Sequence, residues 1–356
     1  MAKVLVAMSG GVDSAVAASL LKEQGYDVMG VFMCLGGEGG ADSQTSGCCS
    51  PQDAADARRV AQQIGIPLYV LNLGDQFRKI IDYFVEEYRN GRTPNPCIQC
   101  NRWLKFGKLF QYADSLGIEY VATGHYARIL RHGGQASIYR KAAETKKDQS
   151  YVLFAISQRY VNRILLPIGE FENKMLVRQY AKAHDFNVHA KPDSQEICFI
   201  DDQSLEAFLR EKSPQSFAPG KIVTEAGEEI GQHEGFMKYT VGQRKGLGLV
   251  RPEPVFVTGL RPAQNEVVVG TRSAAFSASL KASDCNWLCE LGTEFDALVQ
   301  IRSQHSGAMA RVKRTSETEM EVLFREPVFA ITPGQAAVCY EQTPYGDRLL
   351  GGGWIL

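Results

Sequence analysis

The stretch "KVLVAMSGGVDSAVAASLLKEQG" (residues 3–25) decides the fold of the first half of the chain. Its first six residues form an apolar run typical of a buried strand, and "DSAVAASLLKEQG" has the pattern of a helix that Gly25 closes. Between them, "SGGVDS" (9–14) lies where a strand gives way to a helix. Open α/β sheets bind ligands in the crevice at such positions, so this stretch predicts a fold and a site together.

The residue types of "SGGVDS" suit a phosphate group. Gly10 and Gly11 let the backbone approach an anion, the helix N-terminus offers N–H groups, and Ser9 and Ser14 add hydroxyls. The segment lacks the lysine of GxxxxGK[ST], so it is not a Walker A loop. Asp13 is interpreted either as a carboxylate that helps to hold Mg²⁺ against the phosphates or as a first-turn acid favoured by the helix dipole.

The same alternation continues over the first two hundred residues. Strand-like runs at 26–33, 66–73 and 119–127 alternate with helical patterns at 52–65, 76–91 and 107–117. This pattern predicts a doubly wound α/β domain with a parallel sheet over residues 1–207.

The pattern changes near residue 205. Residues 213–249 are dense in Gly and Pro, and "VFVTGL" (255–260) and "EVVVG" (266–270) are typical of short strands. From about residue 275 the pattern is all-β. We predict a small mixed or β-rich central domain over 208–274 and a C-terminal β-barrel over 275–356.

Composition narrows the class of protein. Hydrophobic residues make up 44% of the chain and charged residues 22%, which is ordinary for globular proteins, and no apolar run reaches the roughly 20 residues of a membrane span. "MAKVLVAMSGG" leads directly into a strand rather than into a signal-peptide pattern, so a cytoplasmic protein is expected. The net charge of −1 neither indicates nor excludes a nucleic-acid partner, because binding depends on local patches.

"TPNPCIQCN" (93–101) contains a CxxC formed by Cys97 and Cys100. Nine cysteines in a reducing compartment favour thiols, metal ligands or catalytic groups over a disulfide framework. A structural zinc site would need further ligands, and the candidates are Cys48, Cys49 and Cys198. A thioredoxin-like dithiol expects its CxxC at a helix N-terminus after an early strand, which fits this segment less well.

A third interpretation is chemistry on a substrate, together with Cys198 in "KPDSQEICFI" (191–200). By itself, a cysteine in such an apolar run is more often a small buried hydrophobe. A polar, proline-containing loop precedes it, however, so the thiol could lie at the border between loop and strand.

"SGGVDS" resembles the SGGxDS signature of the PP-loop ATP pyrophosphatases, which cleave ATP between the α and β phosphates and adenylate a carbonyl oxygen. The resemblance becomes more specific when six further segments are added. These are "GVFM", "TPNPCIQCN..LKFG", "ATGHYAR", "KDQSYVLF", "KPDSQEICFI" and "YTVGQRKGLG". In order, from residue 7 to about 248, they are similar to the tRNA-specific 2-thiouridylases (the MnmA/TrmU family), which also have a C-terminal β-barrel.

The resemblance implies a two-step reaction. ATP adenylates the C2 oxygen of uridine 34 at the wobble position of tRNAs for Lys, Glu and Gln, and a persulfide on Cys198 delivers sulfur as AMP leaves. Cys100 corresponds to the second catalytic cysteine, which can form a disulfide with Cys198 during turnover. ATP, Mg²⁺ and a persulfide-donating cysteine desulfurase or relay protein are implied as cofactors and partners. A thiolate or persulfide is the matching soft nucleophile for an adenylated carbonyl.

The resemblance also assigns binding residues. Those implied to contact the nucleotide are Ala7, Met8, Ser9, Gly10, Gly11, Val12, Asp13, Ser14, Met33 and Gly124. Those implied to contact the target base or the tRNA are Asn95, Pro96, Cys97, His125, Asp148, Gln149, Ser150, Arg302, Ser303 and Gln335. Without the resemblance, Met33 would be taken for a core methionine, His125 for a hydrogen-bonded histidine at a strand end, and the segment around "DQS", with Lys146 and Lys147, for a solvated charge run.

The chain departs from the family at Cys97, where well-known members have an aspartate assigned to acid–base work. A thiol with a pKa near 8.5 does not simply replace it. Cys97, Cys100 and Cys198 could instead ligate a [4Fe–4S] cluster with one open iron, so a cluster and a persulfide relay both stay open. Two other classes of protein stay open as alternatives: a PP-loop amide or ligase enzyme, and a nucleotide-gated RNA-binding protein with structural cysteines.

Overall fold

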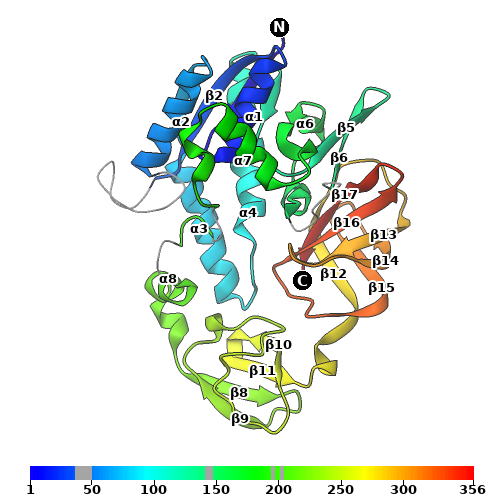
Figure 1. Cartoon of the computed structure of the whole chain (residues 1–356). Coiled ribbons are helices and arrows are strands. Elements are labelled where there is room, and N and C mark those ends of the chain that lie inside the picture. Colours follow the sequence, from blue (N-terminus) through cyan, green and yellow to red (C-terminus); the bar gives the residue numbers. More distant parts are fainter. Residues whose placement is uncertain (37–49, 141–146, 194–196, 201–203) are drawn as a thin grey trace.

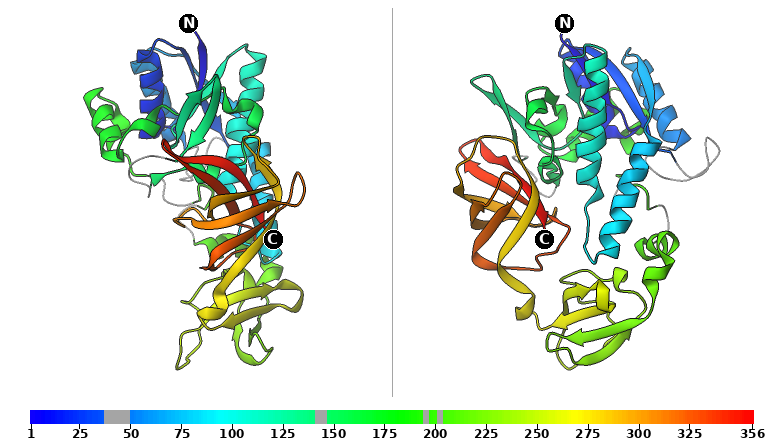
Figure 2. Two further views of the ribbon diagram at one scale, coloured as in Figure 1. Left: turned by 90° about the vertical axis from the view of Figure 1, so that its right-hand side faces the viewer. Right: turned by 180° about the vertical axis from the view of Figure 1, so that it is seen from behind.

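The protein is described by a computed structural model covering residues 1–36, 50–140, 147–193, 197–200 and 204–356 (Figure 1). A five-stranded sheet with its helices lies at one end of the molecule and a four-stranded sheet at the other, with a barrel beside them (Figures 1 and 2). The predicted fold class is confirmed.

The five-stranded sheet is parallel throughout, in the order β3-β2-β1-β4-β7. Its strands are β1 (Lys3–Ala7), β2 (Asp27–Cys34), β3 (Leu68–Asn72), β4 (Tyr120–Ala122) and β7 (Ile164–Leu165). The chain moves outward from β1 to β3 and then returns to the other side of β1 with β4. The strand order therefore reverses between β1 and β4, beside the glycine loop, as ligand crevices of such sheets require.

Helices cover both faces of this sheet. Alternate residues of β1 therefore pack into two different cores. Val4 and Val6 pack with α1 (Val12–Glu23), α2 (Pro51–Gln63) and α7 (Lys174–Ala183). Leu5 and Ala7 pack on the opposite face. That face is covered by the π-helix η2 (Cys100–Lys108) and α5 (Leu109–Ser115). The sheet is doubly wound, as its apolar strand runs predicted.

The central domain shares a core with the N-terminal one. Its mixed sheet has the order β10-β11-β8-β9, with strands β8 (Gly220–Thr224), β9 (Glu229–His233), β10 (Phe256–Arg261) and β11 (Glu266–Gly270), after helix α8 (Leu205–Lys212). Phe84, Val85 and Tyr88, from the last turns of α3 (Gly74–Arg89), pack into the core of this domain. Helix α3 therefore joins the two domains.

The C-terminal barrel closes through six strands in the order β12-β15-β14-β13-β16-β17, with β12 pairing to β17. They are β12 (Phe276–Trp287), β13 (Glu294–Gln300), β14 (Ala308–Arg314), β15 (Met320–Phe329), β16 (Ala336–Thr343) and β17 (Gly346–Ile355). A hairpin that the sequence did not indicate, β5 (Arg128–His132) and β6 (Gln135–Tyr139), extends from the N-terminal domain and pairs with β17.

Short helices complete the described chain: α4 (Pro96–Gln99), α6 (Gln158–Val161), and the 3₁₀ turns η4 (Ser150–Leu153), η5 (Pro167–Glu170), η6 (Asn187–Ala190), η7 (Pro214–Phe217), η8 (Phe236–Lys238), η9 (Pro262–Gln264) and η10 (Ser273–Ala275). None of the helices in the described ranges is long and apolar enough to cross a membrane.

Arg140, directly after β6, fastens the hairpin to the barrel. Its guanidinium donates to Asp347 Oδ2 (3.0 Å) and Gln300 Oε1 (2.8 Å) and lies 4.1 Å from the centre of the Tyr340 ring. The side chain is 12% exposed, so these contacts are largely shielded from water.

We expect Arg140→Met to lower the free energy of unfolding by about 2 kcal/mol, because charge-assisted hydrogen bonds of a shielded group are lost. Urea unfolding followed by tryptophan fluorescence measures this loss. Arg131→Met is the matched control, since Arg131 is exposed on the same hairpin and donates one hydrogen bond to Asn162 O. Equal losses in the two variants would show that Arg140 does not join the domains.

Candidate active site

Two glycines hold the 9–14 loop by close backbone contact. Gly10 has a φ of +75°, and a β-carbon there would lie 2.3 Å from the carbonyl oxygen of Asp53 in α2. Gly124 follows β4, and a β-carbon there would lie 2.8 Å from the carbonyl carbon of Asp13 and 2.9 Å from Ser14 N. The loop therefore packs tightly between α2 and the end of β4, and only glycine fits at these two positions.

The first backbone N–H groups of α1 donate to no capping side chain of the described residues, so they are available to a ligand. Gly11 is the N-cap of α1, and no side chain in the described ranges caps that helix. Ser14 is buried, accepts a hydrogen bond from Ser9 N (3.1 Å) and donates to Gly11 O (3.0 Å), so it braces the loop. Ser9 is exposed at the loop surface. The first N–H groups of α1 and the Ser9 hydroxyl are the groups suited to a phosphate.

Asp13 faces two partners. Tyr126 donates to its Oδ1 (2.6 Å) and Lys174 to its Oδ2 (2.8 Å). Burial and the neighbouring Asp13 charge raise the pKa of the Tyr126 hydroxyl, so it remains protonated and a donor. One carboxylate beside substrate phosphates is a usual Mg²⁺ arrangement, and each Asp13 oxygen has a second lone pair to offer. The residues therefore fit Mg²⁺ binding.

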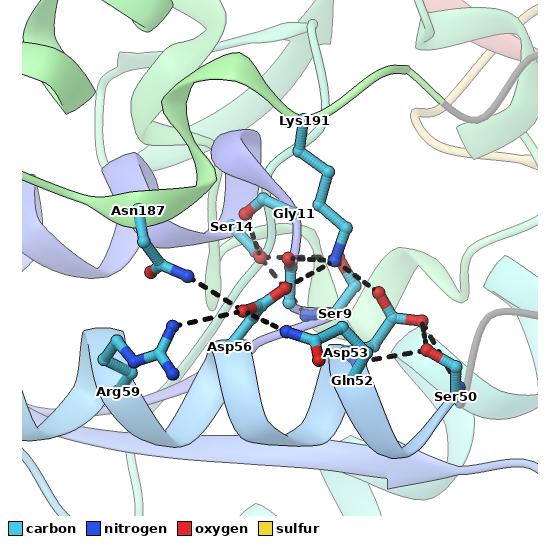
Figure 3. A network of polar contacts seen from close by, with 11 residues as sticks. Ser9, Gly11, Ser14, Ser50, Gln52, Asp53, Asp56, Arg59, Asn187 and Lys191 are labelled. Atoms are coloured by element: carbon cyan, nitrogen blue, oxygen red, sulfur yellow. Dashed lines mark hydrogen bonds and ion pairs between the residues drawn. The ribbon is translucent and has the colours of Figure 1, made fainter.

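Lys191 ties the loop to α2, as Figure 3 shows. Its Nζ lies 3.0 Å from Gly10 O, 2.5 Å from Asp53 Oδ1 and 2.9 Å from Asp56 Oδ2. Burial by itself raises the pKa of Asp56, but hydrogen bonds from Lys191, Asn187 and Gln52 outweigh it, and the net pKa is lowered. Asp56 is therefore a charged partner held inside the protein, with only 5% of it exposed.

Asp193 is the second charged residue of "KPD" (191–193). Lys174 and Arg178 donate to its Oδ1 (2.8 and 2.6 Å), and Lys147 lies 3.3 Å from Oδ2. Burial opposes ionisation, yet hydrogen bonds from Lys174, Lys147 and Arg178 lower the pKa of Asp193 to about 2. Lys174 therefore bridges Asp193 and Asp13.

The CxxC lies inside a helix that begins earlier than the sequence indicated. Pro96 occupies the first position of α4, and Asn95 Oδ1 accepts a hydrogen bond from Cys97 N (3.1 Å). An asparagine cap followed by proline starts a helix at this point, whereas the sequence pattern placed the helix at 107–117. Cys97 is exposed on the first turn and Cys100 is partly buried.

Cys100 begins the π-helix η2. This wide helical form is rare in proteins overall, but it occurs frequently at functional sites. Gly107 of "LKFG" accommodates it, because a β-carbon there would lie 2.8 Å from Arg102 O, five residues earlier.

Cys100 and Cys198 pack against the same apolar cluster, formed by Leu35, Leu73, Phe77, Ile80 and Leu104. Met33, near the end of β2, contacts this cluster as well. Leu35 and Leu73 follow β2 and β3, so the cluster lies at the carboxyl edge of the sheet, the edge that carries the glycine loop. The structure therefore brings two cysteines that are distant in sequence to the sheet edge that carries the glycine loop.

The iron–sulfur hypothesis finds no support in this geometry. Within the described ranges, no three His, Cys, Asp or Glu residues are placed to hold a metal ion. The same ranges contain no disulfide, so a Cys100–Cys198 disulfide during turnover stays a prediction. Cys48, Cys49 and Lys146 lie outside the described residues.

The residues predicted to contact tRNA make contacts within the protein. His125 is buried and shares a 2.7 Å hydrogen bond with Thr123 Oγ1. Asp148 accepts from the Ser150 hydroxyl (2.6 Å), and Gln149 Oε1 accepts from Tyr126 N (3.0 Å). Their tRNA contacts stay predictions.

The predicted barrel residues are placed similarly. Gln335 donates to Thr93 O (2.7 Å), next to the CxxC segment, and Arg302 donates to Phe329 O (3.2 Å). Ser303 O accepts from Gln300 (3.0 Å). Contacts of these residues with tRNA likewise stay predictions.

Sequence reasoning missed four charged or polar residues of the site: Tyr126, Lys174, Lys191 and Asp193. Tyr126, Lys191 and Asp193 lie within quoted motifs, but a motif match does not reveal which side chains turn toward the loop. Lys174, on an ordinary amphipathic helix, gave no signal.

Three family models match the chain in series: the tRNA methyl transferase HUP domain at residues 2–202, the tRNA methyl transferase PRC-barrel domain at 206–271 and the aminomethyltransferase β-barrel domain at 277–355. A tRNA-specific 2-thiouridylase MnmA from Carboxydothermus hydrogenoformans is 49% identical over 99% of this chain and 97% of its own length. The chain belongs to the tRNA-specific 2-thiouridylase family. A thiouridylase from Rhodopirellula baltica is 42% identical over 100% of this chain and 96% of its own.

A solved 4-thiouridine synthetase bound to RNA and ATP is also similar to this thiouridylase-family chain. It is 16% identical, with a TM-score of 0.38, and the match covers 60% of this chain and 51% of the other.

We expect Gly107→Ala to lower the free energy of unfolding by about 1–3 kcal/mol, because the added methyl group forces the π-helix to shift. Urea unfolding measures the change. Gly292→Ala is the control, since a β-carbon there meets only Glu294 O at an ordinary 3.6 Å. A loss for Gly107→Ala no larger than that of the control would contradict the role assigned to this glycine.

His125 makes stability depend on pH. Burial, with the Lys105 charge, holds the pKa of His125 well below its usual value, so the folded protein keeps it neutral while the unfolded chain protonates it near 6.5. The contribution of neutral His125 to the free energy of unfolding is complete above pH 6.5. Below pH 6.5 the free energy of unfolding falls by at most about 1.4 kcal/mol per pH unit. His125→Gln should flatten this fall between pH 7.5 and 5.5, measured by urea unfolding. An unchanged slope in the variant would show that His125 is not the source of this pH dependence.

Proposed function

We propose that this protein catalyses the ATP-dependent 2-thiolation of uridine 34, the wobble base of tRNAs for Lys, Glu and Gln. The observation that carries the proposal is the packing of Cys100 and Cys198 on one apolar cluster at the sheet edge that bears the glycine loop. Two cysteines beside an anion-binding loop suit a sulfur transfer activated by a nucleotide. The relatives' name, tRNA-specific 2-thiouridylase, supports the same reaction.

The first step is adenylation of the base. The C2 oxygen of the uridine attacks the α-phosphorus of ATP, a P–O bond forms, and pyrophosphate leaves. The α1 N-terminal amides and Ser9 hold the phosphates, where developing negative charge is favoured. Mg²⁺, held at Asp13, would neutralise phosphate charge. The uridine must leave its stack to expose C2, and residues 95–97 at the start of α4 would border it.

The second step transfers sulfur. The terminal sulfur of a Cys198 persulfide attacks C2, and AMP leaves. The Cys100 thiolate then attacks the Cys198 sulfur, breaking the S–S bond and releasing 2-thiouridine. A Cys100–Cys198 disulfide results. A thiol reductant then reduces it to two free thiols for the next turnover. The persulfide arises from an upstream cysteine desulfurase or relay protein. We favour this route over an iron–sulfur cluster because two cysteines, rather than three, share the apolar cluster.

The remaining assignments follow the same proposal. Residues 1–207 carry the chemistry, 208–274 form the central domain, and 275–356 form the barrel that contacts tRNA. Cys97 lies exposed beside the expected base position and takes no acid–base role in these two steps. The protein works in the cytoplasm, where tRNA and the persulfide donor are present.

Thiouridine formation from unmodified tRNA, ATP, Mg²⁺ and a persulfide donor, read by mass spectrometry, tests the function. Cys100→Ser and Cys198→Ser should each abolish thiouridine while tRNA binding persists. Cys289→Ser, in the barrel, is the control and should stay active. Ser9→Ala should slow pyrophosphate release, because it removes a phosphate donor.

Absence of thiouridine under both aerobic and anaerobic conditions would refute the function. Amide formation instead would indicate a PP-loop ligase, and tRNA binding alone would indicate an RNA-binding protein. Iron and sulfide quantification after anaerobic purification separates the two sulfur routes: stoichiometric iron, required for activity, would replace the persulfide relay by a cluster.

A further inference from the structure

An exposed tryptophan lies on the helical stretch that carries the CxxC. Within residues 96–108, which comprise α4 and η2, only Cys97 and Trp103 are exposed. Trp103 is 37% exposed and lies three positions after Cys100, so the two residues are within one helical turn of each other. A large aromatic side chain is therefore presented to solvent close to a cysteine proposed to react with the base.

We propose that Trp103 is a stacking platform for an unpaired nucleotide of the tRNA anticodon loop, one of the two that flank the target uridine. The inference rests on the proposed function for the identity of the RNA. It adds a residue that binds this substrate through the face of a base. Such a contact tolerates any base, because every base has a π-face.

The helix around Trp103 is fixed from two sides, since α4 lies between α3 and the barrel (Figure 1). On the α3 side, the ring centres of Tyr83 and Trp103 are 6.0 Å apart and their planes meet at 75°, an edge-to-face contact. On the barrel side, Arg102 donates to both carboxylate oxygens of Asp284 in β12 and lies 5.3 Å from the centre of the Trp354 ring. A base that stacks on Trp103 therefore costs little ordering of the protein.

The charge of the surrounding sequence suits a polyanion. Residues 91–113 contain four basic residues and no acidic one. The basic residues are Arg92, Arg102, Lys105 and Lys108. Glu87 pairs with the first of them and Asp284 with the second, whereas Lys105 and Lys108 form no ion pair with any residue that the structure describes. Two ammonium groups on the helix that carries Trp103 are thus left to attract phosphates.

A single exposed hydrophobic side chain is ordinary on a protein surface. Trp103 differs because the chemistry proposed for Cys100 needs a flipped-out base beside the same helix. When the target uridine leaves its stack, the neighbouring bases lose a stacking partner, and an exposed indole ring can replace that contact. Stacking on Trp103 therefore stabilises the RNA conformation in which the C2 atom is accessible.

Tryptophan fluorescence of the full-length protein tests the contact with an unmodified anticodon stem–loop RNA. Trp103 is the exposed one of the three tryptophans, because Trp287 is partly buried and Trp354 is buried. We expect the RNA to quench the wild-type emission, and Trp103→Phe should lose most of this quenching. Phenylalanine retains a π-face, so this variant should bind the RNA within about threefold of the wild type.

Trp103→Ala removes the platform and should weaken RNA binding by about tenfold. In the thiouridine assay its KM for tRNA should rise by a similar factor with kcat nearly unchanged, because the stack is kept from the bound state through the reaction. Tyr69→Ala is the matched control. Tyr69 is 47% exposed on β3, the edge strand of the parallel sheet, and its loss should leave RNA binding unchanged.

Two abasic RNAs locate the contact without changing the protein, so the test stays decisive if Trp103→Ala does not fold. One lacks the base before the target uridine and the other lacks the base after it. One of them should bind the wild type about tenfold more weakly and quench it less. The same RNA should bind Trp103→Ala with little further loss, because both changes remove one contact.

The platform is overturned if the wild type and Trp103→Phe show equal quenching, if Trp103→Ala binds RNA like the wild type, or if neither abasic RNA differs from the intact one. Failure of the proposed function is a separate result. Stacking without thiouridine formation would keep the platform and refute the function. Thiouridine formation with an unchanged KM for Trp103→Ala would keep the function and overturn the platform.

Discussion

The site depends on one steric constraint, which is the close approach of the glycine loop to its two neighbours. Gly10 contacts the backbone of α2, Gly124 brings the end of β4 against Asp13 and Ser14, and at neither glycine is there room for a β-carbon. Because these contacts are between backbones, the amides at the start of α1 are held in place before any ligand arrives. Preorganised donors cost little reorganisation when charge develops, which is the condition for stabilising a transition state.

The other domains matter because they share cores with the domain that carries the loop. Helix α3 ends in the core of the central domain, and the barrel contributes Tyr340 and Trp354 to the core beneath the parallel sheet. Thr93, just before the CxxC, donates to Pro333 O and accepts from Gln335. The barrel therefore holds the chain just before the helix that carries Cys97 and Cys100. Under the proposed function, this contact would link tRNA binding by the barrel to the geometry of Cys100.

Electrostatics around the loop are balanced before the nucleotide binds. Asp13, Asp56 and Asp193 are each matched by lysine or arginine, and burial of these pairs is offset by several hydrogen bonds to each carboxylate. These partners lower the pKa of Asp56 and Asp193, so both carboxylates stay charged beside the glycine loop.

The sequence by itself determined the doubly wound sheet and the glycine loop, because strand periodicity and glycine placement are local properties, and it predicted through a family resemblance which two cysteines react. It did not reveal the β5–β6 hairpin, whose strands are short and whose partner β17 is about two hundred residues away. It also placed the helix start too late, since the Asn95 cap and Pro96 outweighed the weak helical pattern around the CxxC. Only the tertiary structure decided that Lys174 and Lys191 face the loop. Ion pairs between distant segments depend on how whole elements pack, and no local pattern encodes that.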